Sequence, residues 1–112
     1  MPQRHVLLIT TDQQRFDTIA AAGAGHCITP HLDWMCDRGI RFTRAYADSP
    51  VCGPSRHTIM TGRHAFHQQV DFNAWHPTPI DPRTTLAGLL TSAGFQTRAE
   101  GKMHFHTERT HL

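Results

Sequence analysis

A cysteine lies in a stiff bend between two prolines, in the segment Pro50-Val-Cys-Gly-Pro-Ser-Arg56. Prolines cannot continue a helix interior, and a helix is expected from Ser55 onward, so Cys52 is predicted to lie just ahead of a helix N-terminus. The amides at that end favour negative charge and can make a thiol reactive. Arg56, a turn later, is placed to pair with an oxyanion. A small buried cysteine in a proline turn fits the same residue types equally well.

Lys102 is the single lysine among the 11 Lys and Arg residues, and it follows a glycine after an expected strand. A positioned ammonium at such a place suits the binding of an anionic group. His104 follows two residues later and His106 two after that, so the two rings are expected on opposite sides of an extended chain. The plainer interpretation of Lys102 is a solvated loop residue.

Histidine is unusually frequent, with 10 in 112 residues. His64 and His67 lie near a turn apart and could join His104 and His106 around a zinc ion. Histidines in polar loops are usually surface residues, so the sequence favours that interpretation over a zinc site. The 3 cysteines have no C-x-x-C spacing, which argues against a thiolate zinc site and against a disulfide framework.

Strands and helices must position these residues. Residues 6–11 form an apolar, β-branched run, which predicts a buried parallel strand with Asp12 at its end. A helix with one apolar stripe is expected from Pro30 until Gly39 stops it. Residues 40–47 then predict a second strand.

The second half of the chain continues this alternation. Residues 62–82 are polar, rich in His and Pro and without periodicity, which predicts a long loop at the surface or along a site. A helix capped by Thr84 and a short strand over 96–99 are expected next. The order implies an α/β fold with a parallel sheet. Chemistry in such sheets lies at the carboxyl ends of strands, where Asp12 and Lys102 are both expected.

Length and composition exclude several classes of protein. A chain of 112 residues is at most one domain, and 38% hydrophobic residues argue against disorder. The net charge of +2 is spread along the chain, so no nucleic-acid partner is expected. No apolar run reaches the roughly 20 residues of a membrane span, so no membrane partner is expected either. The first residues lack a signal-peptide pattern, which predicts a cytoplasmic protein.

The segment Cys52-Gly-Pro-Ser-Arg-His-Thr-Ile-Met-Thr-Gly62 resembles the signature of the sulfatase family, C-x-P-S-R followed by T-G. Three further regions match that family in order, namely residues 7–13, residues 29–33, and residues 85–90 with 101–104. The resemblance spans nearly the whole chain. It implies that residues 1–112 form the N-terminal part of a sulfatase catalytic domain with a parallel-sheet, alkaline-phosphatase-like α/β fold.

The same resemblance implies the catalytic roles. Cys52 would be oxidised to formylglycine by a formylglycine-generating maturation enzyme, and the aldehyde hydrate would attack the sulfur of a small-molecule sulfate ester. Arg56 would hold the hydroxylated side chain. Lys102 and His104 would contact the hydrate and the sulfate.

The resemblance also implies a metal site. Asp12 matches the first of two metal-binding acids after the first strand, and Gln13 stands where the second acid is usual. Together with the modified Cys52 they would bind Ca²⁺, or Mg²⁺ or Mn²⁺. An amide oxygen in place of a carboxylate lowers the charge of the site but still suits these oxygen-seeking ions.

Two alternatives stay open. A phosphonate or phosphate-ester hydrolase of the same superfamily could share the Cys-Gly-Pro context, although Ser55 and the Gly-Lys-Met-His104 run favour sulfate. The other alternative is an inert, truncated product without enzymatic activity. Sulfatases are longer than this chain, and their later segments carry further metal ligands and a histidine near the leaving group, so the sequence predicts an incomplete catalytic domain.

Overall fold

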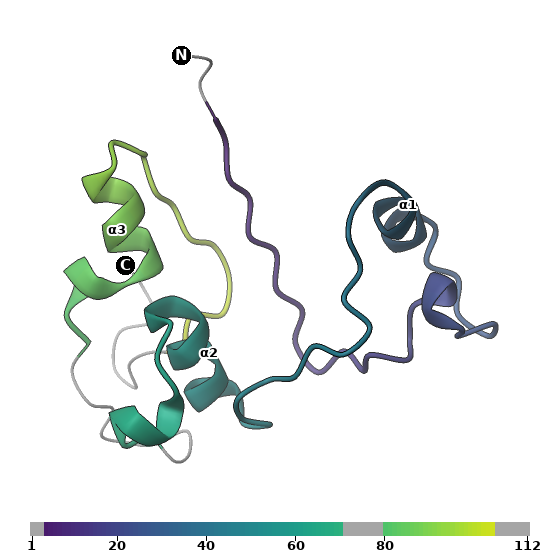
Figure 1. The fold of residues 1–112 in the computed structure, drawn as a ribbon, viewed down its shortest axis with the longest axis horizontal. Coiled ribbons are helices and arrows are strands. Elements are labelled where there is room, and N and C mark those ends of the chain that lie inside the picture. The colour runs from purple at the N-terminus through teal and green to yellow at the C-terminus, as the bar shows by residue number, and fades with distance from the viewer. Residues whose placement is uncertain (1–3, 71–79, 105–112) are drawn as a thin grey trace. The chain divides into compact units, whose positions relative to one another are not determined.

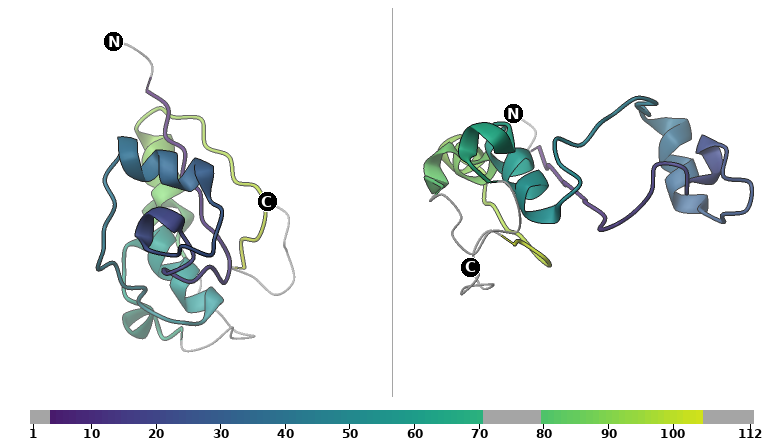
Figure 2. Two further views of the ribbon diagram at one scale, coloured as in Figure 1. Left: turned by 90° about the vertical axis from the view of Figure 1, so that its right-hand side faces the viewer. Right: turned by 90° about the horizontal axis from the view of Figure 1, so that it is seen from below.

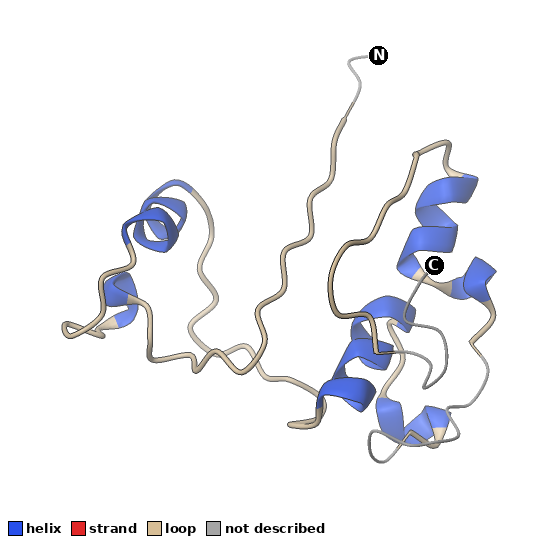
Figure 3. Cartoon of the chain, turned by 180° about the vertical axis from the view of Figure 1, so that it is seen from behind, coloured by secondary structure: helices blue, strands red, loops and turns tan. Residues whose placement is uncertain are grey.

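The computed structural model describes residues 4–70 and 80–104. The chain divides into two compact units, residues 1–45 and 46–112. The described residues form three α-helices and three short 3-10 helices joined by loops (Figure 1), and no strand is found among them (Figure 3). None of the helices in this part of the chain has the length and apolar character needed to cross a membrane.

The first unit is built around α1 (Pro30–Arg38) and the 3-10 helix η1 (Ala20–Ala22). Two side chains hold these elements together. Thr29 Oγ1 accepts a hydrogen bond from the first backbone N–H of η1 at 2.8 Å and donates to Asp33 Oδ1 at 3.0 Å. The Asp33 carboxylate also accepts from the next N–H of η1 at 2.8 Å. The Thr-Pro-His-Leu-Asp segment therefore both opens α1 and satisfies the free amides of η1.

The second unit contains α2 (Cys52–Thr61), η2 (Ala65–Gln68), η3 (Pro82–Thr84) and α3 (Leu86–Ser92). Helix α2 packs against η2 and α3, and α3 packs against η3 (Figure 2). The buried residues of this unit lie on α2, at the start of η2 and just after η2: Gly53, Pro54, His57, Ala65 and Val70. The small core thus surrounds the helix that begins at Cys52.

All three expected helices are found, and two of them start at a different residue from the one expected. Helix α1 starts at Pro30 and is followed by Gly39 as expected. Helix α2 begins at Cys52 and not after it, because Pro54 falls within the first turn, where a missing N–H costs no intrahelical bond. The cap of α3 is Thr85 and not Thr84, since Thr85 Oγ1 accepts from the N–H of Gly88 at 3.1 Å.

The expected strands are not found as strands in the described residues. Residues 6–11, 40–47 and 96–99 carry no strand assignment there. A strand exists only when its backbone pairs with a neighbouring strand, and the apolar side chains of residues 6–9 are 55–83% exposed. The parallel sheet therefore stays a prediction. The expected loop over 62–82 contains η2, and its residues 71–79 lie outside the described residues.

Asp48 joins the segment before α2 to the elements after it. Its Oδ2 accepts from Thr58 Oγ1 on α2 and from the backbone N–H of Ala65, both at 2.8 Å. Its Oδ1 lies 2.5 Å from His64 Nδ1. The N–H of Ala65, the His64 ring and the Thr58 hydroxyl lower the pKa of Asp48 from 3.8 to about 2, because all three favour the ionised carboxylate.

Gly88 occupies a place where a side-chain carbon has no room. A Cβ built there would lie 2.1 Å from the Pro82 carbonyl oxygen and 2.8 Å from the Arg83 Cα. Alanine is the better helix former, but we expect Gly88→Ala to lower the free energy of unfolding by about 1 to 3 kcal/mol because the backbone of η3 must move. Urea denaturation followed by circular dichroism measures this change. Gly25→Ala is the control, because a Cβ added at Gly25 meets nothing within 4 Å. Equal stability of Gly88→Ala and wild type would contradict the expected clash.

The lowered pKa of Asp48 predicts a pH-dependent contribution to stability. A group whose folded pKa lies below its unfolded value stabilises the fold above the unfolded pKa, and this contribution is lost as the pH falls from 3.8 through about 2. We expect the difference in unfolding free energy between wild type and Asp48→Ala to be constant near neutral pH and to shrink over that acidic range. Urea titrations at a series of pH values test this, and a difference that does not change with pH would contradict it.

Candidate functional site

The candidate nucleophile is the first residue of α2. Cys52 is of intermediate burial, and it follows Val51, whose backbone is extended with φ −94° and ψ 134°. The backbone N–H of Ser55 donates to the Val51 carbonyl at 3.1 Å, which closes the first turn. The Pro54 side chain is fully buried beneath this turn. The thiol is thus held at a helix N-terminus, where the amide dipoles favour an anionic partner.

The Thr-Gly end of the signature terminates the same helix. Gly62 has φ 67°, a left-handed conformation that glycine adopts without steric cost, and its N–H donates to the Thr58 carbonyl at 2.8 Å. Thr61 Oγ1 donates to the His57 carbonyl at 2.7 Å. The signature therefore spans one complete helix from its first turn to its C-cap.

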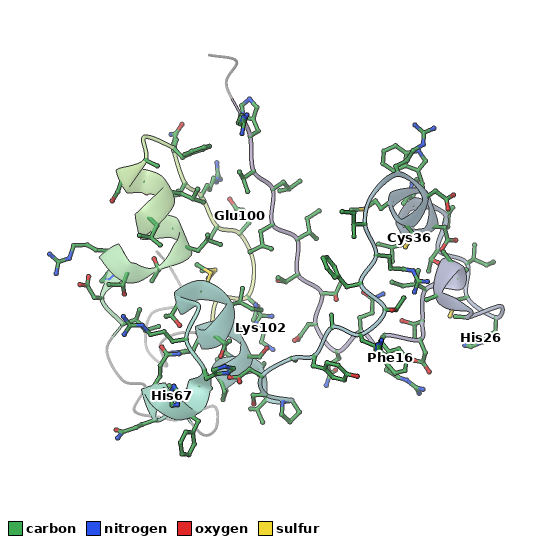
Figure 4. The ribbon with its side chains drawn as sticks, in the orientation of Figure 1. Phe16, His26, Cys36, His67, Glu100 and Lys102 are labelled. Atoms are coloured by element: carbon green, nitrogen blue, oxygen red, sulfur yellow. The ribbon has the colours of Figure 1, made fainter. Side chains whose placement is uncertain are left out.

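Arg56 and the Lys102 segment are brought together. Arg56 Nη1 donates to the backbone carbonyl of Lys102 at 2.6 Å, across 46 positions of sequence. Figure 4 shows Lys102 beside α2. Two of the residues expected at the site, which lie far apart in the sequence, therefore meet on the side of the helix that starts with Cys52.

The segment from Gly101 to His104 is tightly bent. Gly101 has φ 89° and His104 has φ 58°, and the left-handed conformation of a histidine costs energy that its surroundings must offset. Nδ1 of His104 is buried and has no hydrogen-bond partner within the described ranges. Such a nitrogen suits a hydroxyl or an anionic oxygen that enters the site.

Sequence reasoning missed two polar residues near the nucleophile. Asp48 lies four positions before Cys52 and binds residues of α2 and η2, as described above. His57 is only 2% exposed and lies on α2 next to Arg56. The position of Asp48 shortly before Cys52 could have marked it as a candidate from the sequence. The burial of His57 could not be predicted, because nothing in the residue pattern distinguishes a buried histidine from an exposed one.

The zinc hypothesis gains no support from the histidines. The rings of His64 and His67 stand edge to face with centroids 6.0 Å apart, and His64 contacts Asp48. Among the residues whose placement is described, no group of three or more His, Cys, Asp or Glu side chains could hold a metal ion. His106 lies outside the described residues.

The residues expected to bind a divalent cation belong to the first unit. Asp12 and Gln13 are exposed neighbours, and Gln13 has φ 57°, a left-handed bend uncommon for a non-glycine residue. Their carboxylate and amide oxygens are the ligand types that Ca²⁺ and Mg²⁺ prefer. These two side chains fit such an ion chemically but supply only part of the six or more oxygens that Ca²⁺ usually takes.

Comparison with known proteins agrees with the signature. The Sulfatase family model matches residues 4–110. An arylsulfatase from Clostridium perfringens is 34% identical over 109 residues, which cover 94% of this chain and 22% of that protein. Human arylsulfatase D is 31% identical over 89% of this chain and 18% of its own length.

An N-acetylglucosamine-6-O-sulfatase from Bacteroides thetaiotaomicron is 32% identical over 93% of this chain and 18% of that protein. No solved structure matches. The chain thus spans about a fifth of the length of these curated relatives. Because the family model covers almost every residue from the extended N-terminal segment to the histidines near the end, the chain belongs to the sulfatase family.

Proposed function

We propose that this chain supplies the nucleophile and the anion-binding groups of an enzyme that hydrolyses sulfate esters. The observation that carries this proposal is the hydrogen bond from Arg56 to the Lys102 carbonyl, which gathers the signature helix and the Gly-Lys-Met-His104 segment around one place. Membership of the sulfatase family supports the reaction class.

The nucleophile in this proposal is Cys52 after its oxidation to formylglycine. One hydroxyl of the aldehyde hydrate attacks the sulfur as it gives up its proton, and the sulfur–oxygen bond to the alcohol breaks as that alcohol takes up a proton. The second hydroxyl then loses its proton and expels the sulfate, which leaves the aldehyde, and water adds to the aldehyde to restore the hydrate. The first turn of α2 holds this side chain where backbone amides favour developing negative charge. Maturation requires a formylglycine-generating enzyme as a partner of this chain.

Two positively charged residues take part in this proposal. The Arg56 guanidinium holds the bend that carries Lys102, and the proposed role of the Lys102 ammonium is to bind the sulfate oxygens. His104 offers its buried Nδ1 to the hydrate or to a sulfate oxygen. Fixed donors aimed at developing charge stabilise a transition state without reorganising when it forms.

Asp12 and Gln13 would hold a divalent cation, calcium or magnesium, together with oxygen ligands from elsewhere in the protein. Such an ion, when bound, supplies positive charge to the sulfate group. The reduced charge of a Gln13 amide in place of a carboxylate leaves more of that positive charge for the sulfate.

Conversion of Cys52 is the first test. When the chain is coexpressed with a formylglycine-generating enzyme, we expect the peptide that carries Cys52 to lose its thiol and gain an aldehyde that reacts with a hydrazide. Mass spectrometry of the digested protein measures this. Cys27 and Cys36 lie outside the signature and should stay thiols in the same sample. An unchanged Cys52 beside a converted control sulfatase would refute the proposed nucleophile.

The second test ranks three side chains by turnover of an aryl sulfate in the enzyme that carries formylglycine at position 52. We expect Lys102→Ala to reduce kcat by roughly 10² to 10³, the usual effect of removing one aimed donor. Arg56→Ala should cause a loss of similar size, because it removes the bond that holds the Lys102 bend beside α2. His67→Ala should change kcat little, because His67 is an exposed residue of η2. A phosphate monoester with the same leaving group serves as the comparison substrate.

An equal loss in His67→Ala and Lys102→Ala, with a matching loss of bound metal, would assign the metal to the histidine segment instead. If the enzyme hydrolyses the phosphate monoester and not the sulfate ester, the proposed reaction is wrong and the enzyme is a phosphate-ester hydrolase. Circular dichroism of each variant confirms that the compared proteins are folded to the same extent.

A further inference from the structure

Asp48 is a carboxylate that the proposed chemistry does not use. Its side chain is only 19% exposed, although its backbone lies at the surface. Three donors surround the two oxygens: the Thr58 hydroxyl, the Ala65 backbone N–H and the His64 ring. A surface carboxylate with no structural role would be hydrogen-bonded to water. The three hydrogen bonds that Asp48 accepts from the protein therefore need an explanation.

The partners of Asp48 lie on α2 and directly after it. Thr58 belongs to α2 itself, six positions after Cys52, while His64 and Ala65 form the start of η2. One carboxylate therefore binds the incoming chain to the helix and to the segment that follows the helix. The turn that contains Cys52 is enclosed between these attachments.

The short connection from Asp48 to Cys52 has little freedom. Only three residues separate them, and Pro50 is one of these. The Val51 N–H donates to Ser49 Oγ at 3.1 Å, which constrains the same stretch. After the turn, the side chain of Pro54 is fully buried. When Asp48 is held in place, the position at which Cys52 enters α2 is largely determined as well.

We propose that Asp48 is a positioning residue for Cys52, which holds the nucleophile at the first turn of α2 through its contacts with Thr58, His64 and Ala65. This rests on the proposed function in that Cys52 is taken as the reacting residue. The same contacts keep the negative charge of Asp48 occupied by donors, so that it does not compete with an anionic substrate for the amides of the helix.

The reactivity of the unmodified thiol tests this proposal without any need for catalysis. The reduced chain is treated with iodoacetamide at neutral pH, and the alkylation rate of each cysteine is measured by mass spectrometry against the rate in urea. We expect Cys52 to be protected in wild type. In Asp48→Ala its rate should rise on the order of tenfold, since hydrogen bonds to a charged group are among the stronger ones.

The conservative variant separates hydrogen bonding from simple packing. The amide of Asp48→Asn can still accept from the Ala65 N–H and can donate to a neutral His64 Nδ1. We therefore expect this variant to restore Cys52 to within about twofold of its wild-type rate. Thr58→Val removes a single contact and should give an intermediate rate. Failure of Asp48→Asn to restore protection would contradict the assigned contacts.

Asp81→Ala is the matched control. Asp81 is another carboxylate of the second unit that accepts from a backbone N–H, at 3.0 Å from Arg83, and pairs with the Arg83 side chain. Its removal should leave the Cys52 rate unchanged. Cys27 and Cys36 belong to the first unit and should react at wild-type rates in every variant.

Two results overturn the proposal. One is a folded Asp48→Ala chain in which Cys52 keeps its wild-type protection, and the other is an equal rise in Asp81→Ala. If circular dichroism shows that Asp48→Ala does not fold, the Thr58→Val variant decides between the outcomes. A chain that hydrolyses no sulfate ester but shows the expected Cys52 rates would refute the proposed function and leave the role of Asp48 intact.

Discussion

The hydrogen bond between the Arg56 guanidinium and the Lys102 carbonyl is the contact on which the candidate site depends. It joins the helix that begins at Cys52 to the bend that carries the lysine and His104. A charged donor makes a stronger bond to a carbonyl than a neutral donor does, and its fixed plane restricts the direction of approach. This long-range contact thus brings the signature helix and the Gly-Lys-Met-His104 segment together at the candidate site.

The helix itself is held at its ends more than along its length. At its start lies the buried ring of Pro54, and at its finish lies Gly62 with its left-handed backbone. These are the positions at which a helix leaves amides and carbonyls without intrahelical partners. A helix of 10 residues would be marginal alone, so such end contacts account for much of its stability.

Local features of the chain were predictable from sequence, and contacts between distant segments were not. The helix from Pro30 and the helix after the cysteine follow from proline, glycine and apolar spacing, which act within a few residues. The attachment of Asp48 to Ala65 and of Arg56 to Lys102 uses backbone groups as partners, and backbone groups are the same for every residue type. The expected strands depend on remote pairing, which no local pattern guarantees.

The bond from Arg56 supports the bend without using the side chain that the bend carries. Its acceptor is a main-chain carbonyl, and the peptide oxygen is present whichever amino acid occupies position 102. A substitution of Lys102 therefore removes the ammonium while the contact that supports the bend can persist. The support of the bend and the charge that it carries are encoded by different atoms of the same residue.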